Sequence, residues 1–192
     1  MSKLIKGTQT EINLLKSFAG ESQARNRYTF FAEQAEEEGF IQIANVFLET
    51  SEQEFAHAHR FFEFLKGGGV EIKAMYPAGV IGDTAENLKA SAEGEHEEWS
   101  VLYPAFAEIA NEEGFKDVAT AFKMIAKVEE EHEKRYRAFL ENIEKNRVFE
   151  REDKVKWECS NCGYVHIGKK ALENCPACLF PKDFFQLKAE NW

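Results

Sequence analysis

The chain carries the same helical metal-binding pattern twice. A Glu-x-x-His pattern at Glu54 and His57 recurs in the second half of the chain at Glu129 and His132. On an α-helix, residues three apart lie on one face about a turn apart, so a glutamate and a histidine at this spacing can bind one ion or two adjacent ions. The repeat therefore predicts a fold in which two such helices bring their ligands to a shared ion site.

Other residues repeat with almost the same offset. Glu38-Gly39-Phe40 recurs as Glu113-Gly114-Phe115 at the same distance along the chain that separates Glu54 from Glu129. Gly20-Glu21 recurs as Gly94-Glu95 at a distance shorter by a single residue. An offset that is kept across this many residue types indicates a duplicated structural unit. Each copy of the unit contributes ligand candidates.

Composition excludes several classes of partner. The 192 residues include 34 acidic and 24 basic side chains, which gives a formal net charge of −10. This charge argues against nucleic acid or an anionic membrane surface as a partner. The sequence has no stretch of 18 apolar residues, and residues 1–7 lack the apolar centre of a signal peptide. We therefore expect no nucleic acid, no membrane and a cytoplasmic location.

Apolar periodicity predicts four long helices, over residues 10–38, 40–66, 84–114 and 115–146. Thr8 and Glu11 have the spacing of a capping box for the first helix. Asp83, with Glu86 three residues later, is the expected N-cap of the third helix. Pro104 lies inside the third helix and is expected to kink it.

The connections between these helices predict how the helices pack. The chain turns tightly at Gly39 and at Gly114, so the two helices on either side of each glycine should be antiparallel. Residues 67–83 instead form a long connection. A four-helix bundle with one long crossover is the ferritin-like arrangement. Each helix also places a carboxylate in its apolar stripe, which is destabilising unless the carboxylate is paired or binds a metal. We predict a mainly α, ferritin-like di-iron domain over residues 1–148.

The predicted ligands combine carboxylates with imidazoles: Glu21, Glu54, His57, Glu95, Glu98, Glu129 and His132. This mixture suits iron, whereas magnesium or calcium would not recruit histidine. The pattern of single glutamates plus two Glu-x-x-His pairs is that of di-iron bundles. Two ferrous ions, or two ferric ions bridged by one oxide, bring the same total charge against five carboxylates. The site charge therefore changes little on oxidation, which favours two buried irons that are oxo-bridged when oxidised.

Other polar side chains have simpler interpretations. Glu98, taken alone, would more often be an exposed helix charge. Tyr28 lies about two turns after Glu21 on the same face, so it could hydrogen-bond a ligand carboxylate or be an ordinary buried aromatic residue. We expect three histidines to occupy surface or core positions without a metal: His59, His96 and His166. We expect three glutamates to lie on the solvated face of the last helix: Glu130, Glu131 and Glu133.

All four cysteines lie near the end of the chain, in two Cys-x-x-Cys pairs that 12 residues separate: Cys159, Cys162, Cys175 and Cys178. In a reducing compartment this spacing indicates a tetrahedral four-sulfur metal site rather than disulfides. Zinc and a single iron use the same geometry, but a redox di-iron site in the same chain favours iron. We predict that residues 149–192 form a second domain, too small to hold a core without its metal.

Together these features resemble the rubrerythrin family of non-haem iron peroxidases, which join a ferritin-like di-iron domain to a C-terminal rubredoxin-like domain. The resemblance covers essentially the whole chain and is carried by Gly20-Glu21-Ser22-Gln23-Ala24-Arg25-Asn26-Arg27-Tyr28, Glu54-x-x-His57, Gly94-Glu95-x-x-Glu98, Glu129-x-x-His132 and Cys162-Gly163-Tyr164-Val165-His166. Free-standing rubredoxins differ in having a longer loop between the knuckles and usually a glycine where Leu179 stands here.

The resemblance implies a role for each ligand candidate. It makes Glu54 and Glu129 bridging carboxylates. Glu21 and Glu98 would be terminal ligands of one iron, and Glu95 and His132 those of the other. His57 would replace Glu98 when the first iron moves on reduction. Tyr28 and Tyr103 would be the tyrosines that stand behind the ligands. Four residues are thus expected to act in catalysis: Glu98, His57, Tyr28 and Tyr103.

The implied activity is the reduction of hydrogen peroxide to water in oxidative-stress defence, of the NADH-peroxidase type, with electrons relayed through the four-cysteine iron from an external rubredoxin or reductase. The 14 residues from His132 to Asn146 carry the chain about 21 Å along a helix before the small domain begins. We therefore expect a head-to-tail homodimer, which the resemblance also implies. The alternatives are a ferroxidase or iron-handling protein of the ferritin type, and a non-enzymatic binding module whose four cysteines hold structural zinc.

Overall fold

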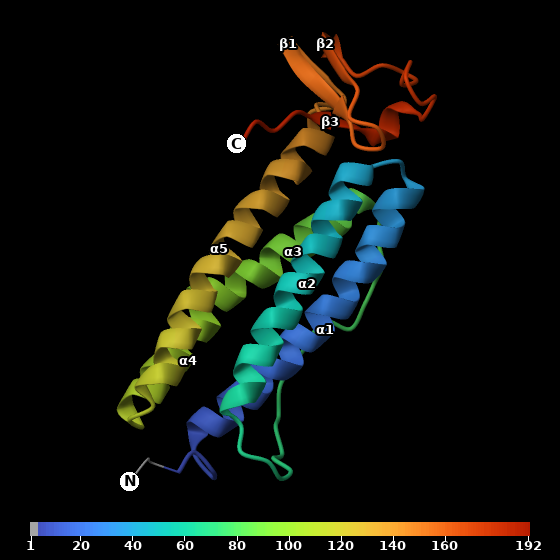
Figure 1. Ribbon diagram of the computed structural model, residues 1–192. Helices are drawn as coiled ribbons and strands as arrows, with labels where there is room; N and C mark the ends of the chain where they lie inside the picture. The colour runs from blue at the N-terminus through green and yellow to red at the C-terminus, as the bar shows by residue number, and fades with distance from the viewer. Residues whose placement is uncertain (1–3) are drawn as a thin grey trace.

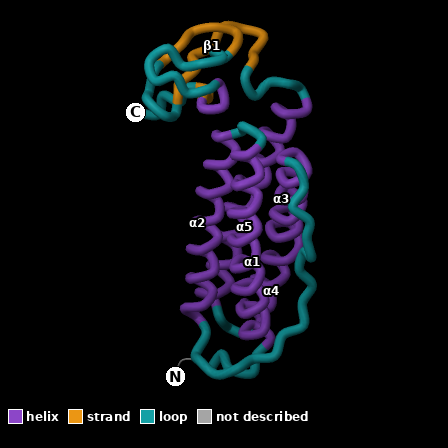
Figure 2. The backbone as a smooth tube through the Cα atoms, turned by 90° about the vertical axis from the view of Figure 1, so that its right-hand side faces the viewer, coloured by secondary structure: helices purple, strands orange, loops and turns teal. Residues whose placement is uncertain are grey.

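Helices form the first three quarters of the protein in its computed structural model, which describes residues 4–192. The helices are α1 (Gln9–Glu37), α2 (Ile41–Phe64), α3 (Thr84–Glu97), α4 (Tyr103–Glu112) and α5 (Lys116–Glu144). They run side by side as a bundle, and the long connection between α2 and α3 follows the outside of that bundle (Figures 1 and 2). This confirms the predicted ferritin-like bundle with one long crossover. Residues 1–3, with which the predicted domain begins, lie outside the described residues.

Two capping motifs set the starts of α1 and α3. Asp83 and Glu86 form the complete capping box that the sequence predicts for α3. At α1, the Thr8 hydroxyl accepts a hydrogen bond from the Glu11 N–H at 3.1 Å, but the Glu11 carboxylate accepts from the Gly7 N–H at 2.7 Å. The box of α1 therefore closes one residue earlier than expected. Both arrangements satisfy backbone donors that a helix start leaves unpaired.

The two halves of the duplicated unit also cap each other. Glu38, at the end of α1, accepts hydrogen bonds from the Thr84 N–H at the start of α3, at 3.2 Å. Glu113, at the end of α4, accepts from the Thr10 N–H at the start of α1, at 2.8 Å. A carboxylate near a helix N-terminus also interacts favourably with the helix dipole. The repeated Glu-Gly-Phe segments therefore tie each half of the bundle to the other.

A π-helical turn over Glu98–Leu102 divides the predicted third helix into α3 and α4. The sequence predicts one helix kinked at Pro104; the structure instead widens the helix just before this proline. Proline has no N–H, and in a continuous α-helix its ring would clash with the carbonyl four residues earlier, so a wider turn relieves both problems. The turn holds one residue more than the matching part of α1. The distance along the sequence between matching residues is accordingly one residue longer after the turn, between Tyr28 and Tyr103, than before it, between Gly20 and Gly94.

The core consists of two aromatic clusters along the bundle. One contains Tyr28 and Tyr136, whose ring centroids lie 5.6 Å apart, and the other contains Phe61 and Phe122 at 4.9 Å. In α1, α2 and α5 the predicted ligands lie in sequence between members of the two clusters. The ligands therefore occupy the middle of the bundle, with apolar packing towards both ends.

A small sheet follows the bundle. Strands β1 (Glu150–Cys159), β2 (Val165–Lys170) and β3 (Phe185–Leu187) pair antiparallel in the order β2-β1-β3, with a 3₁₀ turn at Lys182–Phe184 before β3. The sheet lies at the end of the bundle reached by α5 (Figure 1). Its core is formed by Trp157, Cys159, Ala171, Cys175 and Phe185.

The small sheet contacts the turn between α1 and α2. Phe149 stacks on Phe40 with ring centroids 6.2 Å apart and planes 7° from parallel. Gly39 has φ +81°, and a Cβ there would lie 2.9 Å from the Asp183 side chain, so glycine is required both for the turn and for the contact. The predicted division after residue 148 falls between α5 and β1 and stays a prediction. Within residues 4–192, no helix has the length and apolarity needed to cross a membrane.

Candidate metal centre

Four helices and the π turn bring the predicted ligands to the middle of the bundle. Glu21 belongs to α1, Glu54 and His57 to α2, Glu95 to α3, Glu98 to the π turn, and Glu129 and His132 to α5. Four of the carboxylates, Glu21, Glu54, Glu95 and Glu129, are at most 1% exposed. Buried carboxylates are costly unless they are paired or bind a metal. Their convergence is therefore a strong indication of a metal site.

The donor atoms form two overlapping groups. One group contains Glu21, Glu54, His57 and Glu129, and the other contains Glu54, Glu95, Glu129 and His132; within each group the donor atoms lie within 4.8 Å of one another. Both groups share Glu54 and Glu129. His57 Nδ1 lies 2.9 Å from Glu54 and 3.0 Å from Glu129, and His132 Nδ1 lies 3.2 Å and 2.9 Å from the same two carboxylates. Two adjacent ions held by these groups would therefore share Glu54 and Glu129 as ligands.

Glu98 belongs to neither donor group within the described chain. It lines a cleft beside the centre, and its Oε1 lies close to Gly20. His57 completes the group that contains Glu21 instead. The structure thus brings six of the seven predicted ligands together and places the seventh next to them.

Two buried tyrosines hold terminal carboxylates across the bundle. The Tyr28 hydroxyl donates a hydrogen bond to Glu95 Oε1 at 2.5 Å, and the Tyr103 hydroxyl donates to Glu21 Oε1. Each tyrosine belongs to one half of the repeat and its carboxylate to the other. The two tyrosines therefore fix the terminal carboxylates and also join the halves.

Gln53 is a site residue that the sequence analysis missed. Its Oε1 lies 2.9 Å from His132 Nε2, the ring nitrogen that points away from the carboxylates, and 3.4 Å from Arg135 Nη2. Such a partner fixes the orientation and tautomer of a ligand histidine. At the matching position before Glu129 stands Val128, which has no acceptor to offer His57. The difference between the two copies was a usable signal in the sequence.

Glu133 was expected on the solvated face of the last helix, and this expectation is wrong. Its side chain is largely buried and accepts hydrogen bonds from Trp99 Nε1 at 2.5 Å, Arg137 Nε at 2.6 Å and His96 Nδ1 at 3.0 Å. Trp99 follows Glu98 in the π turn. Glu133 therefore fastens this turn to α5 directly beside His132.

Burial and mutual repulsion dominate the electrostatics of the metal-free site. Burial, reinforced by neighbouring carboxylates, holds the pKa of Glu21, Glu95 and Glu98 well above the ordinary value. Burial acts the same way on Glu54, but hydrogen bonds from His132 and His57 outweigh it and lower the pKa of Glu54 to about 2.

The two histidines show the opposite shift. Burial opposes their charged forms, yet hydrogen bonds to Glu129 and Glu54 raise the pKa of His57 to about 10 and that of His132 to about 9. Protonated imidazoles thus supply the positive charge that the shared carboxylates require when no metal is bound.

The donor set fits two irons. Glu21 Oε2 and Glu95 Oε2 are buried and have no hydrogen-bond partner, although the other oxygen of each carboxylate accepts from a tyrosine. A buried acceptor without a donor is rare in native proteins, and these two oxygens are suited to bind a metal ion. Carboxylate oxygens with one imidazole in each group are the donors of di-iron bundles.

The four cysteine sulfurs also meet at one point. Cys159 Sγ lies 3.8 Å from Cys178 Sγ, and Cys162 Sγ lies 3.6 Å from Cys175 Sγ. Four sulfurs placed tetrahedrally about 2.3 Å from a metal would be about 3.8 Å apart. The side chain of Asn161 and the backbone N–H of Phe180 donate to Cys178 and lower its pKa to about 6. The site fits one iron or one zinc ion.

Comparison with known proteins agrees with both sites. The family model described as rubrerythrin matches residues 13–140, and the one described as the rubredoxin-like domain of rubrerythrin matches residues 157–186. The chain belongs to the rubrerythrin family. It is 59% identical to rubrerythrin of Porphyromonas gingivalis over 100% of this chain and 96% of that protein. It is 55% identical to rubrerythrin of Nitratidesulfovibrio vulgaris over 99% of this chain and 100% of that protein.

Solved structures show the same fold. A structure of partially reduced nigerythrin aligns with a TM-score of 0.61 at 32% identity, covering 97% of this chain and 90% of that one. The structure of symerythrin from Cyanophora paradoxa, reduced with dithionite, aligns with a TM-score of 0.60 at 27% identity, covering 74% of this chain and 89% of that one. Membership of the rubrerythrin family confirms the di-iron bundle and the rubredoxin-like domain that the sequence predicts.

Proposed function

We propose that this rubrerythrin-family chain is a non-haem di-iron peroxidase that reduces hydrogen peroxide to two water molecules, consuming two electrons and two protons. The observation that carries the proposal is the pairing of two overlapping donor groups, which share Glu54 and Glu129, with a four-cysteine site in the same chain. Two irons held by these donor groups would supply together the two electrons that reductive cleavage of the O–O bond requires, so that no radical would be released. A storage bundle would not need the four-cysteine site.

The side chains around the centre hold the ligands and handle protons. Tyr28 and Tyr103 keep Glu95 and Glu21 in place through their hydroxyl groups. Glu98 stands between the centre and the cleft with a raised pKa, so its carboxyl group can hold a proton next to an entering peroxide. His57 already lies with Glu21, which supports the assignment of His57 and Glu98 as alternative ligands of that position.

Electrons would reach the centre from an external donor of the rubredoxin or reductase type through the four-cysteine iron. Helix α5 continues 12 residues beyond His132, about 18 Å, before the small sheet begins. Transfer within one chain is therefore long, which supports a head-to-tail homodimer. The exposed side chains of Leu48, Phe55 and Phe62 stand seven residues apart on α2, the helix of His57, and would be covered by a second copy. Four cysteines that meet at one metal site favour a reducing compartment such as the cytoplasm.

The test is to purify the chain without oxygen, load it with iron and reduce it. Mixing with hydrogen peroxide should consume one peroxide for every two electrons stored, and the red ferric tetrathiolate absorption should return. A ferritin-type iron-handling protein would instead accumulate iron beyond three ions per chain with little peroxide consumed. A colourless, redox-silent four-cysteine site would identify structural zinc and contradict the electron relay.

A further inference from the structure

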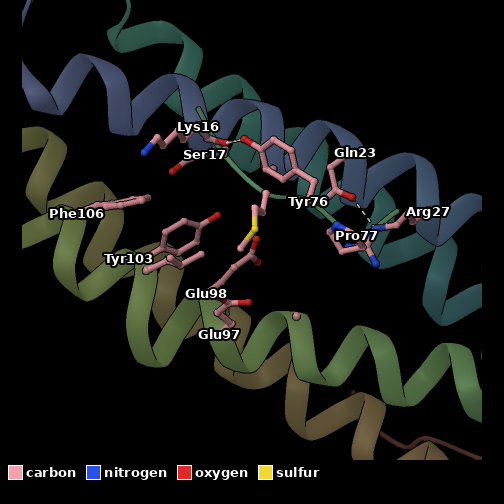
Figure 3. Close-up of a pocket in the computed structure, with 15 residues that line it drawn as sticks. Lys16, Ser17, Gln23, Arg27, Tyr76, Pro77, Glu97, Glu98, Tyr103 and Phe106 are labelled. Atoms are coloured by element: carbon pink, nitrogen blue, oxygen red, sulfur yellow. Dashed lines mark hydrogen bonds between the residues drawn. The ribbon is translucent and has the colours of Figure 1, made fainter. Parts of the chain in front are cut away.

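A cleft of about 340 Å³ opens beside the metal centre, between α1 and the π turn (Figure 3). Its inner wall includes Glu98 and Tyr103, and the connection between α2 and α3 crosses it with Met75, Tyr76 and Pro77. In Figure 3, Tyr76 lies along α1, and Glu98 and Tyr103 face it from the opposite side. The Tyr76 hydroxyl donates a hydrogen bond to the Lys16 carbonyl oxygen at 2.7 Å, which fastens the crossing segment to α1.

Two glycines in helix interiors line this cleft. Gly20 in α1 and Gly94 in α3 both line it, and each directly precedes a ligand glutamate in the repeated Gly-Glu pattern. Glycine is among the poorest residues for a helix interior, so neither helix gains from it. A Cβ on Gly20 would lie 3.7 Å from the Tyr76 ring and 3.8 Å from Glu98 Oε1, and one on Gly94 would meet nothing within 4 Å. A longer side chain at Gly20 would enter the space between Tyr76 and Glu98.

The cleft is larger and more apolar than hydrogen peroxide requires. On the same measure a water molecule needs roughly 10–15 Å³, so a molecule of two oxygen atoms would occupy only a small part of the volume. Carbon-rich side chains, including Leu102, Phe106 and Met75, line it together with the Glu98 carboxyl and further polar side chains, among them Lys16, Gln23, Arg27 and Glu97. An apolar wall beside a small number of polar groups is the construction of a site for a small amphipathic molecule.

We propose that this cleft is the substrate site of the centre and that it takes short-chain alkyl hydroperoxides as well as hydrogen peroxide. The inference rests on the proposed peroxidase function. The alkyl group would contact Leu102 and Phe106, and the hydroperoxide group would hydrogen-bond to Glu98. In the reaction the O–O bond breaks, two electrons come from the reduced centre and ultimately from the external donor protein, two protons come from solvent, and the products are one alcohol and one water.

The test compares hydrogen peroxide with tert-butyl hydroperoxide as oxidants of the reduced, iron-loaded full chain. Their second-order rate constants should lie within about tenfold of each other, whereas a site that excludes the alkyl group should disfavour it by roughly 100-fold or more. Gly20→Leu should lower the rate with tert-butyl hydroperoxide far more than the rate with hydrogen peroxide. Gly20→Ala, whose Cβ makes only ordinary contacts, should change the ratio of the two rates far less.

A binding measurement supports the kinetic one. The product tert-butanol should receive saturation transfer in NMR from the zinc-loaded full chain, and Gly20→Leu should abolish the signal. Gly94→Leu, which adds a side chain where α3 lines the cleft, is the second variant to test if Gly20→Leu fails to fold or to bind metal.

The outcomes separate the two proposals. Rapid oxidation by hydrogen peroxide, with tert-butyl hydroperoxide slower by roughly 100-fold or more and no saturation transfer, would overturn the cleft inference and leave the peroxidase intact. Equal effects of the leucine variants on both oxidants would also overturn it. Failure of both oxidants would overturn the proposed function itself.

Discussion

Loading the bundle with iron should expel protons, and the structure sets the minimum number. His57 and His132 have pKa values of about 10 and about 9, so at pH 7 both rings are protonated in the metal-free protein. In each ring Nδ1 is the nitrogen that faces the shared carboxylates, and it must lose its proton before it can bind a metal. We therefore predict that at least two protons leave per chain at pH 7. Protonated carboxyls among the other ligands add to that number.

Two protons give a steep dependence of affinity on pH. The apparent affinity for the pair of ferrous ions should rise by at least about 100-fold for each unit of pH between 7 and 8. The assay is calorimetric titration with ferrous ion in buffers of different ionisation enthalpy, after one equivalent of zinc has filled the four-cysteine site. His132→Ala should reduce the proton count by about one. His59→Ala, which removes an exposed histidine of the same helix as His57, is the matched control and should leave the count unchanged.

The reasoning would be refuted by an affinity that does not change between pH 7 and 8, or by loading that releases no proton at pH 7. Either result would mean that the histidines are neutral in the metal-free protein. The positive charge that balances Glu54 and Glu129 would then have to come from elsewhere.

The same contacts support four more predictions. The metal-free protein should lose stability, measured by thermal unfolding, as pH rises from 6 to 9, because folding raises the pKa values of its histidines and buried carboxyl groups. The loss should be about 1.4 kcal/mol per pH unit for each proton that only the folded chain holds. Iron should reverse this loss. Gln53→Leu should weaken iron binding by roughly 10- to 100-fold with little change in the unfolding of the metal-free protein, and an unchanged affinity would contradict the role of Gln53. Glu98→Ala should reduce peroxide turnover much more than stability, and an equal loss of both would show that its role is structural. Glu113→Ala should cost about 1 kcal/mol in chemical denaturation through the lost cap of α1, whereas the exposed Glu112→Ala should cost much less.

The repeat and the apolar periodicity were sufficient to predict the bundle and most of its centre. Residues three apart on a helix share a face whatever packs against them, so Glu54 with His57 and Glu129 with His132 could be paired from sequence alone. The cysteine spacing similarly predicts a site that needs only local knuckles. These features depend on short-range geometry, which the sequence specifies directly.

Contacts between helices were harder to predict. Periodicity places Glu133 on a helix face but does not show that Trp99 and His96 of the neighbouring segment approach it. It also does not show that Gln53 of α2 meets His132 of α5. Such partners depend on the relative translation of two helices, which no single-helix pattern contains. The unlike residues Gln53 and Val128 in otherwise matching positions were the nearest sequence signal.

The π turn explains why a duplicated fold has an asymmetric centre. Matching residues of the two halves are one residue further apart in sequence from Tyr103 onwards than they are up to Gly94. The second half therefore contains one additional residue between Gly94 and Tyr103, where the π turn lies. The turn begins at Glu98, and the matching position in α1 is Ala24. Two identical halves could supply two equivalent metal positions but no preferred side for a substrate. The half that contains the widened turn has an additional carboxylate, Glu98, and the cleft lies beside that carboxylate. Under the proposed function, the π turn held by Glu133 is thus the structural element that gives the otherwise symmetric metal site a substrate side.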